Sequence, residues 1–274
     1  MSKFKVGLIQ IKVEDKKEDN LYKAAKLIDV ICKEDVDMVI LPEMFSCPYN
    51  TKNFPIYAEE VGDYSYKFLS EISKRNNIYL IAGSIPEKEG SNIYNTSYVF
   101  NRQGEKIAKY RKIHLFDIDI KNKQTFRESD TLSAGDKVTV FDSEFGKIGL
   151  CICYDFRFPE LARLMVDKGA KAIIVPASFN MTTGPAHWDI MFRSRAIDNQ
   201  VYTIGCSPAR DYDYSYISYG HSLIVSPYGD ILCELDEKEN FITYDIDLDY
   251  VDEIREQLPL LKHRRSDLYE LLEK

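Results

Sequence analysis

The chain lacks an excess of positive charge and has no long apolar run. Its 36 Lys and Arg residues are outnumbered by 44 Asp and Glu residues, which gives a net charge of −8 and a pI of about 5.2. A nucleic-acid-binding protein would carry a basic patch, whereas the one basic cluster here, 262–265, is short and has acids nearby. No stretch approaches the roughly 18 apolar residues of a membrane helix. We therefore expect neither a nucleic-acid nor a membrane partner.

Metal and secretion signatures are also missing. The four His residues are scattered, and none has zinc-binding spacing to another His or to a Cys. The six Cys residues lie mostly in apolar strand-like runs, where Cys acts as a small buried hydrophobe. The apolar run 4–11 is too short for a secretory signal and leads into a charged helix. We expect free thiols in a reducing cytoplasm, no metal and no cofactor.

Apolar strands alternate with amphipathic helices along the 274 residues, and hairpins occur among them. Strands are predicted at residues 4–11, 36–41, 79–83, 94–101, 106–110, 137–141, 148–152, 172–175, 201–206, 219–225, 231–234 and 241–246. Helices are predicted at residues 17–33, 64–76, 158–167, 188–199, 248–255 and 267–272. The pattern predicts a layered α/β domain with helices outside mixed sheets, and it leaves one sheet or two open. No linker divides the chain, so one domain over 1–274 is expected.

Cys153 stands at a corner between a strand and a helix. The apolar strand 148–152 runs into it, and a polar, aromatic turn follows. A thiol at such a corner points out of the sheet edge, where a covalent catalyst would be placed. Cys153 could instead be a buried structural thiol. The polar neighbours Tyr154, Asp155 and Arg157 favour the nucleophile.

Two further polar residues follow predicted strands. Glu43 follows a buried strand and Pro42. Open α/β sheets bind ligands at the carboxyl ends of their strands, so this position suits a functional residue. Taken alone, however, Glu43 is better explained as a loop acid that caps a turn. Lys112 follows the strand that ends at Tyr110, in a basic stretch that alone predicts a solvated face. With Cys153 they supply the base, the cation for the oxyanion and the nucleophile that amide hydrolysis by a thiol needs. We expect the strand ends to bring the three to one edge.

These residues lie in motifs that resemble the carbon–nitrogen hydrolase (nitrilase) superfamily, whose signature is a Glu–Lys–Cys triad. The resemblance covers nearly the whole chain. The matching segments are Leu41-Pro42-Glu43, Tyr110-Arg111-Lys112-Ile113-His114-Leu115, Cys153-Tyr154-Asp155-Phe156-Arg157-Phe158-Pro159-Glu160 and residues 193–200. The resemblance implies a four-layer α-β-β-α sandwich that forms a homodimer or higher homo-oligomer. It also places the C-terminal helical tail at the subunit interface.

Within that superfamily the chain is similar to the ω-amidase (Nit2-like) branch, through the segments 179–188 and 126–129. Its elbow departs from the Cys-Trp-Glu that nitrile-hydrolysing members usually carry. The branch implies hydrolysis of the ω-amide of small dicarboxylate monoamides: 2-oxoglutaramate, 2-oxosuccinamate, glutaramate or succinamate. It also implies a fourth residue, Glu128, which supports Lys112 or orders substrate. The alternative for Glu128 is an exposed loop acid.

The resulting hypothesis assigns a role to each residue. Cys153 attacks the amide carbon while Glu43 accepts its proton, and Lys112 and the backbone N–H of Tyr154 hold the oxyanion. Glu43 then gives its proton to the departing ammonia and activates the water that hydrolyses the thioester.

The distal carboxylate of such a substrate needs a cation. Arg157 lies one helical turn after Cys153 and is the candidate, the alternative being a salt bridge with Glu160 or Asp155. Three more residues are expected to line the pocket, although ordinary loop packing would also account for them: Phe179, Thr183 and Tyr49.

Three competing functions remain open at this point. A deaminated-glutathione amidase or an N-carbamoyl amino-acid amidohydrolase would share the triad and differ only in the pocket. A catalytically silent scaffold that binds small carboxylates would need no triad at all. The presence of all three residues, Glu43, Lys112 and Cys153, argues against the scaffold.

Overall fold

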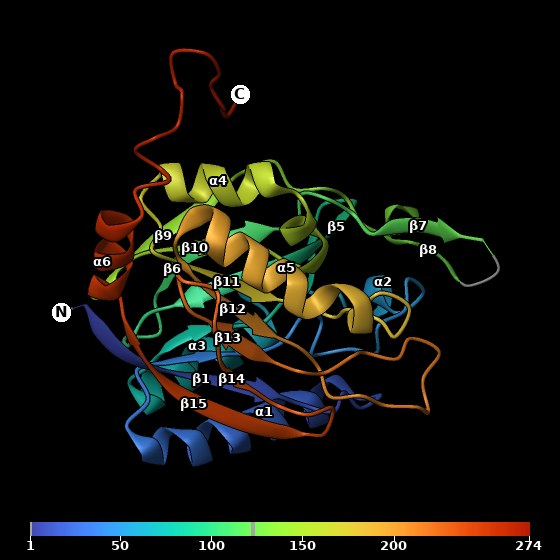
Figure 1. Ribbon diagram of the computed structural model, residues 1–274. Coiled ribbons are helices and arrows are strands. Elements are labelled where there is room, and N and C mark those ends of the chain that lie inside the picture. Colours follow the sequence, from blue (N-terminus) through green and yellow to red (C-terminus); the bar gives the residue numbers. More distant parts are fainter. Residues whose placement is uncertain (1, 122–123) are drawn as a thin grey trace.

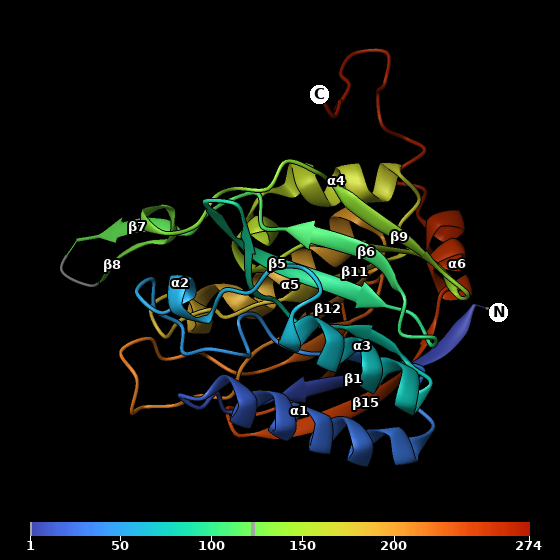
Figure 2. The same cartoon turned by 180° about the vertical axis from the view of Figure 1, so that it is seen from behind.

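A computed structural model describes residues 2–121 and 124–274 (Figure 1). Two β-sheets lie face to face, and helices cover their outer faces. Figure 2 shows α1 (Lys17–Ile31) and α3 (Tyr64–Asn76) on the outside of one sheet, with α4 (Pro159–Asp167) on the opposite side of the molecule. The α-β-β-α sandwich is thus confirmed, and two sheets are present rather than one.

The first sheet has seven strands in the order β15-β1-β2-β3-β5-β4, and β6 also pairs with β5. Strands β1, β2 and β3 run parallel, and the other pairs are antiparallel. The bounds are β1 Lys3–Gln10, β2 Met38–Ile40, β3 Tyr79–Ile81, β4 Ile85–Glu89, β5 Asn92–Phe100, β6 Lys106–Arg111 and β15 Asn240–Asp247.

The second sheet has six strands in the order β14-β13-β12-β11-β10-β9, of which β10, β11 and β12 run parallel. Its bounds are β9 Thr139–Ser143, β10 Gly146–Leu150, β11 Ala172–Pro176, β12 Tyr202–Cys206, β13 Leu223–Val225 and β14 Ile231–Glu234. A separate hairpin, β7 (Asp117–Ile120) and β8 (Gln124–Arg127), projects from the side of the sandwich (Figure 1).

Helices α4 and α5 (Gly184–Asn199) pack on the second sheet, and α6 (Asp249–Gln257) follows β15. A short helix α2 (Phe54–Tyr57) and the 3-10 turns η1 (Cys32–Glu34), η2 (Glu128–Asp130) and η3 (Cys153–Arg157) complete the elements. None of the described helices is long and apolar enough to cross a membrane.

The sandwich forms because its central strands are apolar on both faces. On β2, Met38 and Ile40 belong to the core between the sheets, whereas Val39 and the following Leu41 pack in the core beneath the outer helices. All four side chains are fully buried. The period of two residues sends alternate side chains to opposite faces, and helices on one side and a sheet on the other remove both faces from water.

Most predicted elements are confirmed, but three segments differ. The connection 112–136 contains the hairpin β7–β8, whose exposed, half-charged strands carry little apolar periodicity. Strand β4 was not predicted. The predicted helix at 267–272 is wrong, because this segment forms only turns and irregular structure. Leu268 and Leu272 are 70% and 67% exposed, and so short a helix is not stable without packing.

Gly83 provides a test of how the fold supports the loop that follows β2. Its φ is +45°, and a Cβ there would lie 2.2 Å from the carbonyl oxygen of Pro42. We expect Gly83→Ala to lower the free energy of unfolding by about 3 kcal/mol, since left-handed strain and a backbone clash combine. Urea unfolding followed by fluorescence of the single tryptophan, Trp188, measures this.

Gly90→Ala is the matched control. Gly90 also has a positive φ, +61°, but a Cβ there would meet nothing within 4 Å. Only the backbone strain of about 1 kcal/mol is expected. An equal decrease in the free energy of unfolding in the two variants would show that the close contact with the Pro42 carbonyl does not affect stability.

Candidate active site

The three motif residues converge from two sheets rather than from one edge of a single sheet. Glu43 follows β2 and Lys112 follows β6, both in the first sheet, whereas Cys153 opens η3 after β10 of the second sheet. The expectation of one shared edge holds for Glu43 and Lys112 and is corrected for Cys153, which comes from the other sheet. Strand β6 is antiparallel to β5, which is itself antiparallel to β3, so β6 runs in the direction of β2 and both strands end at the same edge of the first sheet.

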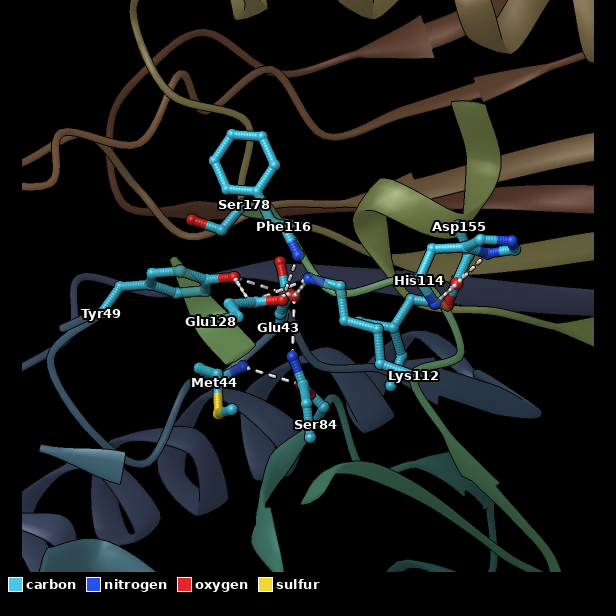
Figure 3. A network of polar contacts seen from close by, with 12 residues as sticks. Glu43, Met44, Tyr49, Ser84, Lys112, His114, Phe116, Glu128, Asp155 and Ser178 are labelled. Carbon is cyan, nitrogen blue, oxygen red and sulfur yellow. Dashed lines mark hydrogen bonds and ion pairs between the residues drawn. The ribbon is translucent and has the colours of Figure 1, made fainter. Parts of the chain in front are cut away.

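Lys112 is the buried cation of the site. Its Nζ donates to Glu43 Oε1 at 3.0 Å and to Glu128 Oε1 at 2.9 Å, and its side chain is fully buried (Figure 3). Burial lowers the pKa of Lys112, but the charges of Glu128 and Glu43 outweigh this and raise it above its usual value. Lys112 therefore stays charged, and the interpretation as a solvated basic face is wrong.

Glu128 is buried as well, so the interpretation as an exposed loop acid is wrong. Besides Lys112, its Oε1 accepts a hydrogen bond from the hydroxyl of Tyr49 at 2.5 Å. Its Oε2 accepts from the backbone N–H of Phe116 at 2.7 Å. Each carboxylate oxygen thus has a donor, and the arrangement fixes Glu128 as the support of Lys112.

Glu43 is 1% exposed, so it is not a solvated turn cap. Its Oε1 accepts from Lys112, from Asn95 Nδ2 at 2.9 Å and from the Tyr49 hydroxyl at 3.2 Å. Its Oε2 has no hydrogen-bond donor in the ranges 2–121 and 124–274. Burial raises the pKa of Glu43, Lys112 partly opposes the rise, and the charge of Glu128 adds to it. A buried base with one open oxygen results.

Cys153 adopts a left-handed backbone with φ of +48°. Such strain in a residue with a side chain is characteristic of functional corners, and it matches the predicted elbow. The thiol is 5% exposed and interacts with Glu43 and Lys112. Burial and the charge of Glu43 raise its pKa, and Lys112 only partly opposes them. The resting thiol is therefore neutral and needs a base to become a nucleophile.

Asp155 ties the elbow to the loop that carries Lys112. Its carboxylate accepts hydrogen bonds from the Tyr110 hydroxyl and the His114 backbone N–H, both at 2.7 Å. It also accepts from the backbone N–H of Ile152 at 3.2 Å. Tyr110 and His114 stand two residues either side of Lys112, so this buried carboxylate fixes the second sheet's nucleophile against the first sheet's cation.

A small cavity opens beside Cys153. Its lining residues are Phe116, Cys153, Tyr154, Arg157, Ser178, Phe179, Asn180, Thr183 and Tyr216. Arg157 lies over the Phe179 ring, 4.6 Å from its centroid, and contacts His187 Nδ1 at 3.0 Å. Within the described chain Arg157 forms no ion pair with Glu160 or Asp155, so that alternative is wrong. Burial lowers the pKa of Arg157.

The structure thus brings together most of the predicted site residues. Arg157, Phe179 and Thr183 line the cavity, as does Tyr154, whose backbone role stays a prediction. Tyr49 does not line this cavity. Its hydroxyl contacts the two carboxylates instead, as Figure 3 shows.

Two residues of the site escaped the sequence analysis. Asn95 holds Glu43 with its side chain and accepts the backbone N–H of Lys112 with its carbonyl at 2.9 Å. Tyr216 closes the cavity wall, and its ring stacks on Tyr49 with centroids 4.4 Å apart. A lone Asn inside an apolar strand is disfavoured and was the only signal available. Tyr216, one of 19 tyrosines, had none.

The described residues contain no group of three or more His, Cys, Asp or Glu arranged to hold a metal ion. The residues that surround Cys153 are a buried carboxylate, a buried ammonium group and the lining of a cavity.

Comparison with known proteins identifies this arrangement. The family model for carbon–nitrogen hydrolases matches residues 5–256. The chain belongs to the carbon–nitrogen hydrolase family. It is therefore a hydrolase that acts on carbon–nitrogen bonds.

Individual relatives match over almost their whole length. Omega-amidase NIT2-B of Xenopus laevis is 49% identical over 274 residues, which are 100% of this chain and 99% of that protein. Omega-amidase NIT2 of Homo sapiens is 47% identical, with 98% of each chain covered. The crystal structure of Saccharomyces cerevisiae Nit3, a member of branch 10 of the nitrilase superfamily, superposes with a TM-score of 0.89 at 44% identity, over 96% of this chain and 97% of that one.

Asn95 gives a test of the site in this hydrolase. Asn95→Leu removes a donor to the Glu43 carboxylate, which disfavours the charged form and raises the pKa of Glu43 further. Because the base acts without its proton, the acid limb of kcat/KM should move to higher pH by roughly one unit. The pH profile of ammonia release from an amide substrate measures the shift.

Thr96→Val is the matched control for Asn95→Leu. It also removes one buried donor, from Thr96 Oγ1 to Glu87 Oε2 at 2.6 Å, but that carboxylate does not touch Glu43. The acid limb should stay in place. An unshifted limb in Asn95→Leu would mean that Asn95 does not tune Glu43.

Proposed function

We propose that the protein is an ω-amidase, which hydrolyses the terminal amide of small dicarboxylate monoamides through a thioester on Cys153. The main structural support is the buried Lys112, which Glu43 and Glu128 hold next to a neutral thiol and a cavity lined by Arg157. The names of relatives 47–49% identical over the full length support the same activity.

In the acylation step, the Cys153 sulfur bonds to the amide carbon while its proton passes to Oε2 of Glu43. Lys112 and the backbone N–H of Tyr154 stabilise the oxyanion. Loss of a single oxyanion donor typically lowers the rate ~10²–10³-fold. The carbon–nitrogen bond then breaks as Glu43 returns the proton to nitrogen, and ammonia leaves. Such proton transfers contribute ~10²–10⁴-fold.

In the deacylation step, Glu43 takes a proton from water, whose oxygen attacks the thioester carbon. The carbon–sulfur bond breaks, the sulfur regains a proton from Glu43, and the dicarboxylate leaves. The same carboxylate thus serves both half-reactions, which fits its one open oxygen.

The substrate class follows from the charge of the cavity. Arg157 is the one charged side chain in its lining, and it can pair with a distal carboxylate while the amide reaches Cys153. We propose 2-oxoglutaramate, 2-oxosuccinamate, glutaramate and succinamate as substrates.

We further propose a homodimer or higher homo-oligomer, with the C-terminal tail from residue 248 onward at the interface, as the family resemblance implies. A reducing cytoplasm is the proposed compartment, since all six cysteines are free thiols.

An ammonia-release screen over the four monoamides, deaminated glutathione, ureido acids and aliphatic nitriles tests the proposal. We expect turnover of the monoamides. Carbon dioxide with ammonia from ureido acids would indicate a carbamoyl substrate, and preference for deaminated glutathione would indicate that amidase instead. No turnover at all would leave the carboxylate-binding scaffold.

Cys153→Ala should abolish monoamide hydrolysis, because no acyl acceptor remains. Intact-mass analysis of acid-quenched wild type should show an acyl adduct on Cys153, released by hydroxylamine. Cys151→Ala, at a second buried thiol two residues away, is the control and should retain the adduct. Residual activity in Cys153→Ala would reject the covalent route.

Arg157→Met should raise KM for glutaramate by about 30-fold or more, because an anion then lacks its partner. KM for pentanamide, which has a methyl group in place of the carboxylate, should hardly change. Arg163→Met is the control, since Arg163 lies on α4 outside the cavity and contacts the Asp198 carbonyl. Equal effects on both amides would remove Arg157 from substrate recognition.

A further inference from the structure

A second narrow cavity, large enough for molecules the size of water, reaches the candidate active site at Glu43. It touches Glu43 and Tyr49 at its inner end, and the partly exposed residues Asp211 and Tyr214 also line it. It therefore runs between the buried base and the protein surface. It does not include Cys153 or Arg157 in its lining.

The two cavities share a wall made of Ser178 and Tyr216. The Tyr216 hydroxyl donates to the backbone carbonyl of Ser178, and the Tyr216 ring stacks on Tyr49. The Ser178 hydroxyl lies 2.8 Å from that of Ser218. This wall is fixed by hydrogen bonds and stacking. Glu43 lines the second cavity, Cys153 lines the first, and the two side chains interact with each other.

The two cavities differ in charge. The cavity beside Cys153 is lined by Arg157 and by no carboxylate. The second cavity is lined by two carboxylates, Glu43 and Asp211, and by no Lys or Arg. Lys12 pairs with Asp211 at 3.0 Å from outside the lining. An anionic substrate is attracted to the first cavity, whereas the second suits neutral or cationic molecules.

We propose that the second cavity is the passage through which ammonia leaves and the hydrolytic water enters. This rests on the proposed amidase function. During the thioester stage the acyl chain fills the cavity beside Cys153 and its carboxylate remains on Arg157. The nitrogen that has received the proton of Glu43 is then next to the second cavity, and the water that replaces it must reach the open Oε2 of the same carboxylate.

Ala209→Leu tests the passage. Ala209 is a buried lining residue of the second cavity, and its backbone N–H bonds to the Ile11 carbonyl, so a larger side chain narrows the space without removing a polar contact. The probe is p-nitrophenyl acetate, which acylates Cys153 by losing nitrophenolate and needs neither Arg157 nor ammonia release. We expect the nitrophenolate burst to be unchanged. The deacylation rate, measured with water or with added hydroxylamine, should fall about tenfold.

With glutaramate the same variant should show a lower kcat, accumulation of acyl-enzyme by intact mass and no rise in KM. Thr183→Leu is the matched control, because it narrows the cavity beside Cys153 instead. It should raise KM for glutaramate and leave deacetylation by hydroxylamine at the wild-type rate. Val13→Trp, on the lining of the second cavity, repeats the test if Ala209→Leu melts at a much lower temperature than wild type.

An unchanged deacylation rate in both Ala209→Leu and Val13→Trp would overturn the proposal. So would a raised KM for glutaramate with normal deacylation, which would make the second cavity the substrate site. Failure of the ω-amidase function is a separate result, because wild type would then not hydrolyse glutaramate. The acetyl-enzyme experiment would still decide whether water and hydroxylamine use this passage.

Discussion

The site depends on one buried ammonium group that two carboxylates share. A charge removed from water costs several kcal/mol, and only good geometry with further hydrogen bonds offsets this. Lys112 meets that condition because Glu43 and Glu128 both contact its Nζ. Tyr49 and Asn95 then donate to the same carboxylates, which leaves one oxygen of Glu43 open. The neutral Cys153 thiol interacts with the Glu43 carboxylate and with the Lys112 charge, so the cluster contains the base and the oxyanion cation of the proposed mechanism.

The two-sheet fold is what allows these charges to meet away from water. One sheet carries Glu43 and Lys112, the proposed base and cation, and the other carries Cys153, the proposed nucleophile, on a strained corner. Asp155 joins the two halves through Tyr110 and His114, so the distance between thiol and ammonium does not rest on loop packing alone. The space between the sheets is dry because β2 and its neighbours are apolar on both faces. The same burial raises the pKa of Glu43 and Cys153 and so sets the chemistry.

The features that could be predicted from the sequence are those encoded by local hydrophobic periodicity and by short motifs. Helix 64–76 was predicted with its true bounds, and the strand-end positions of Glu43 and Cys153 pointed to chemistry. The sequence could not tell how many sheets form, since periodicity gives the faces of a strand and not its partners. The burial of Glu128 depends on its contacts with Lys112 and the distant Tyr49 at the base of the hairpin, and the role of Asn95 depends on strand pairing. Residues 267–272 show the reverse error, where helical propensity had no packing to support it.

In the proposed mechanism Glu43, held by Lys112, is the base that takes the proton of a neutral Cys153. The pH dependence of Cys153 alkylation by iodoacetamide, read by peptide mass in wild type and Glu43→Gln, tests it most directly. The wild-type rate should follow the loss of the Glu43 proton rather than the ionisation of an ordinary thiol, whose pKa is about 8.5. Glu43→Gln should lose this reactivity. A wild-type rate that follows a single ionisation near that thiol value, unchanged in Glu43→Gln, would contradict the account.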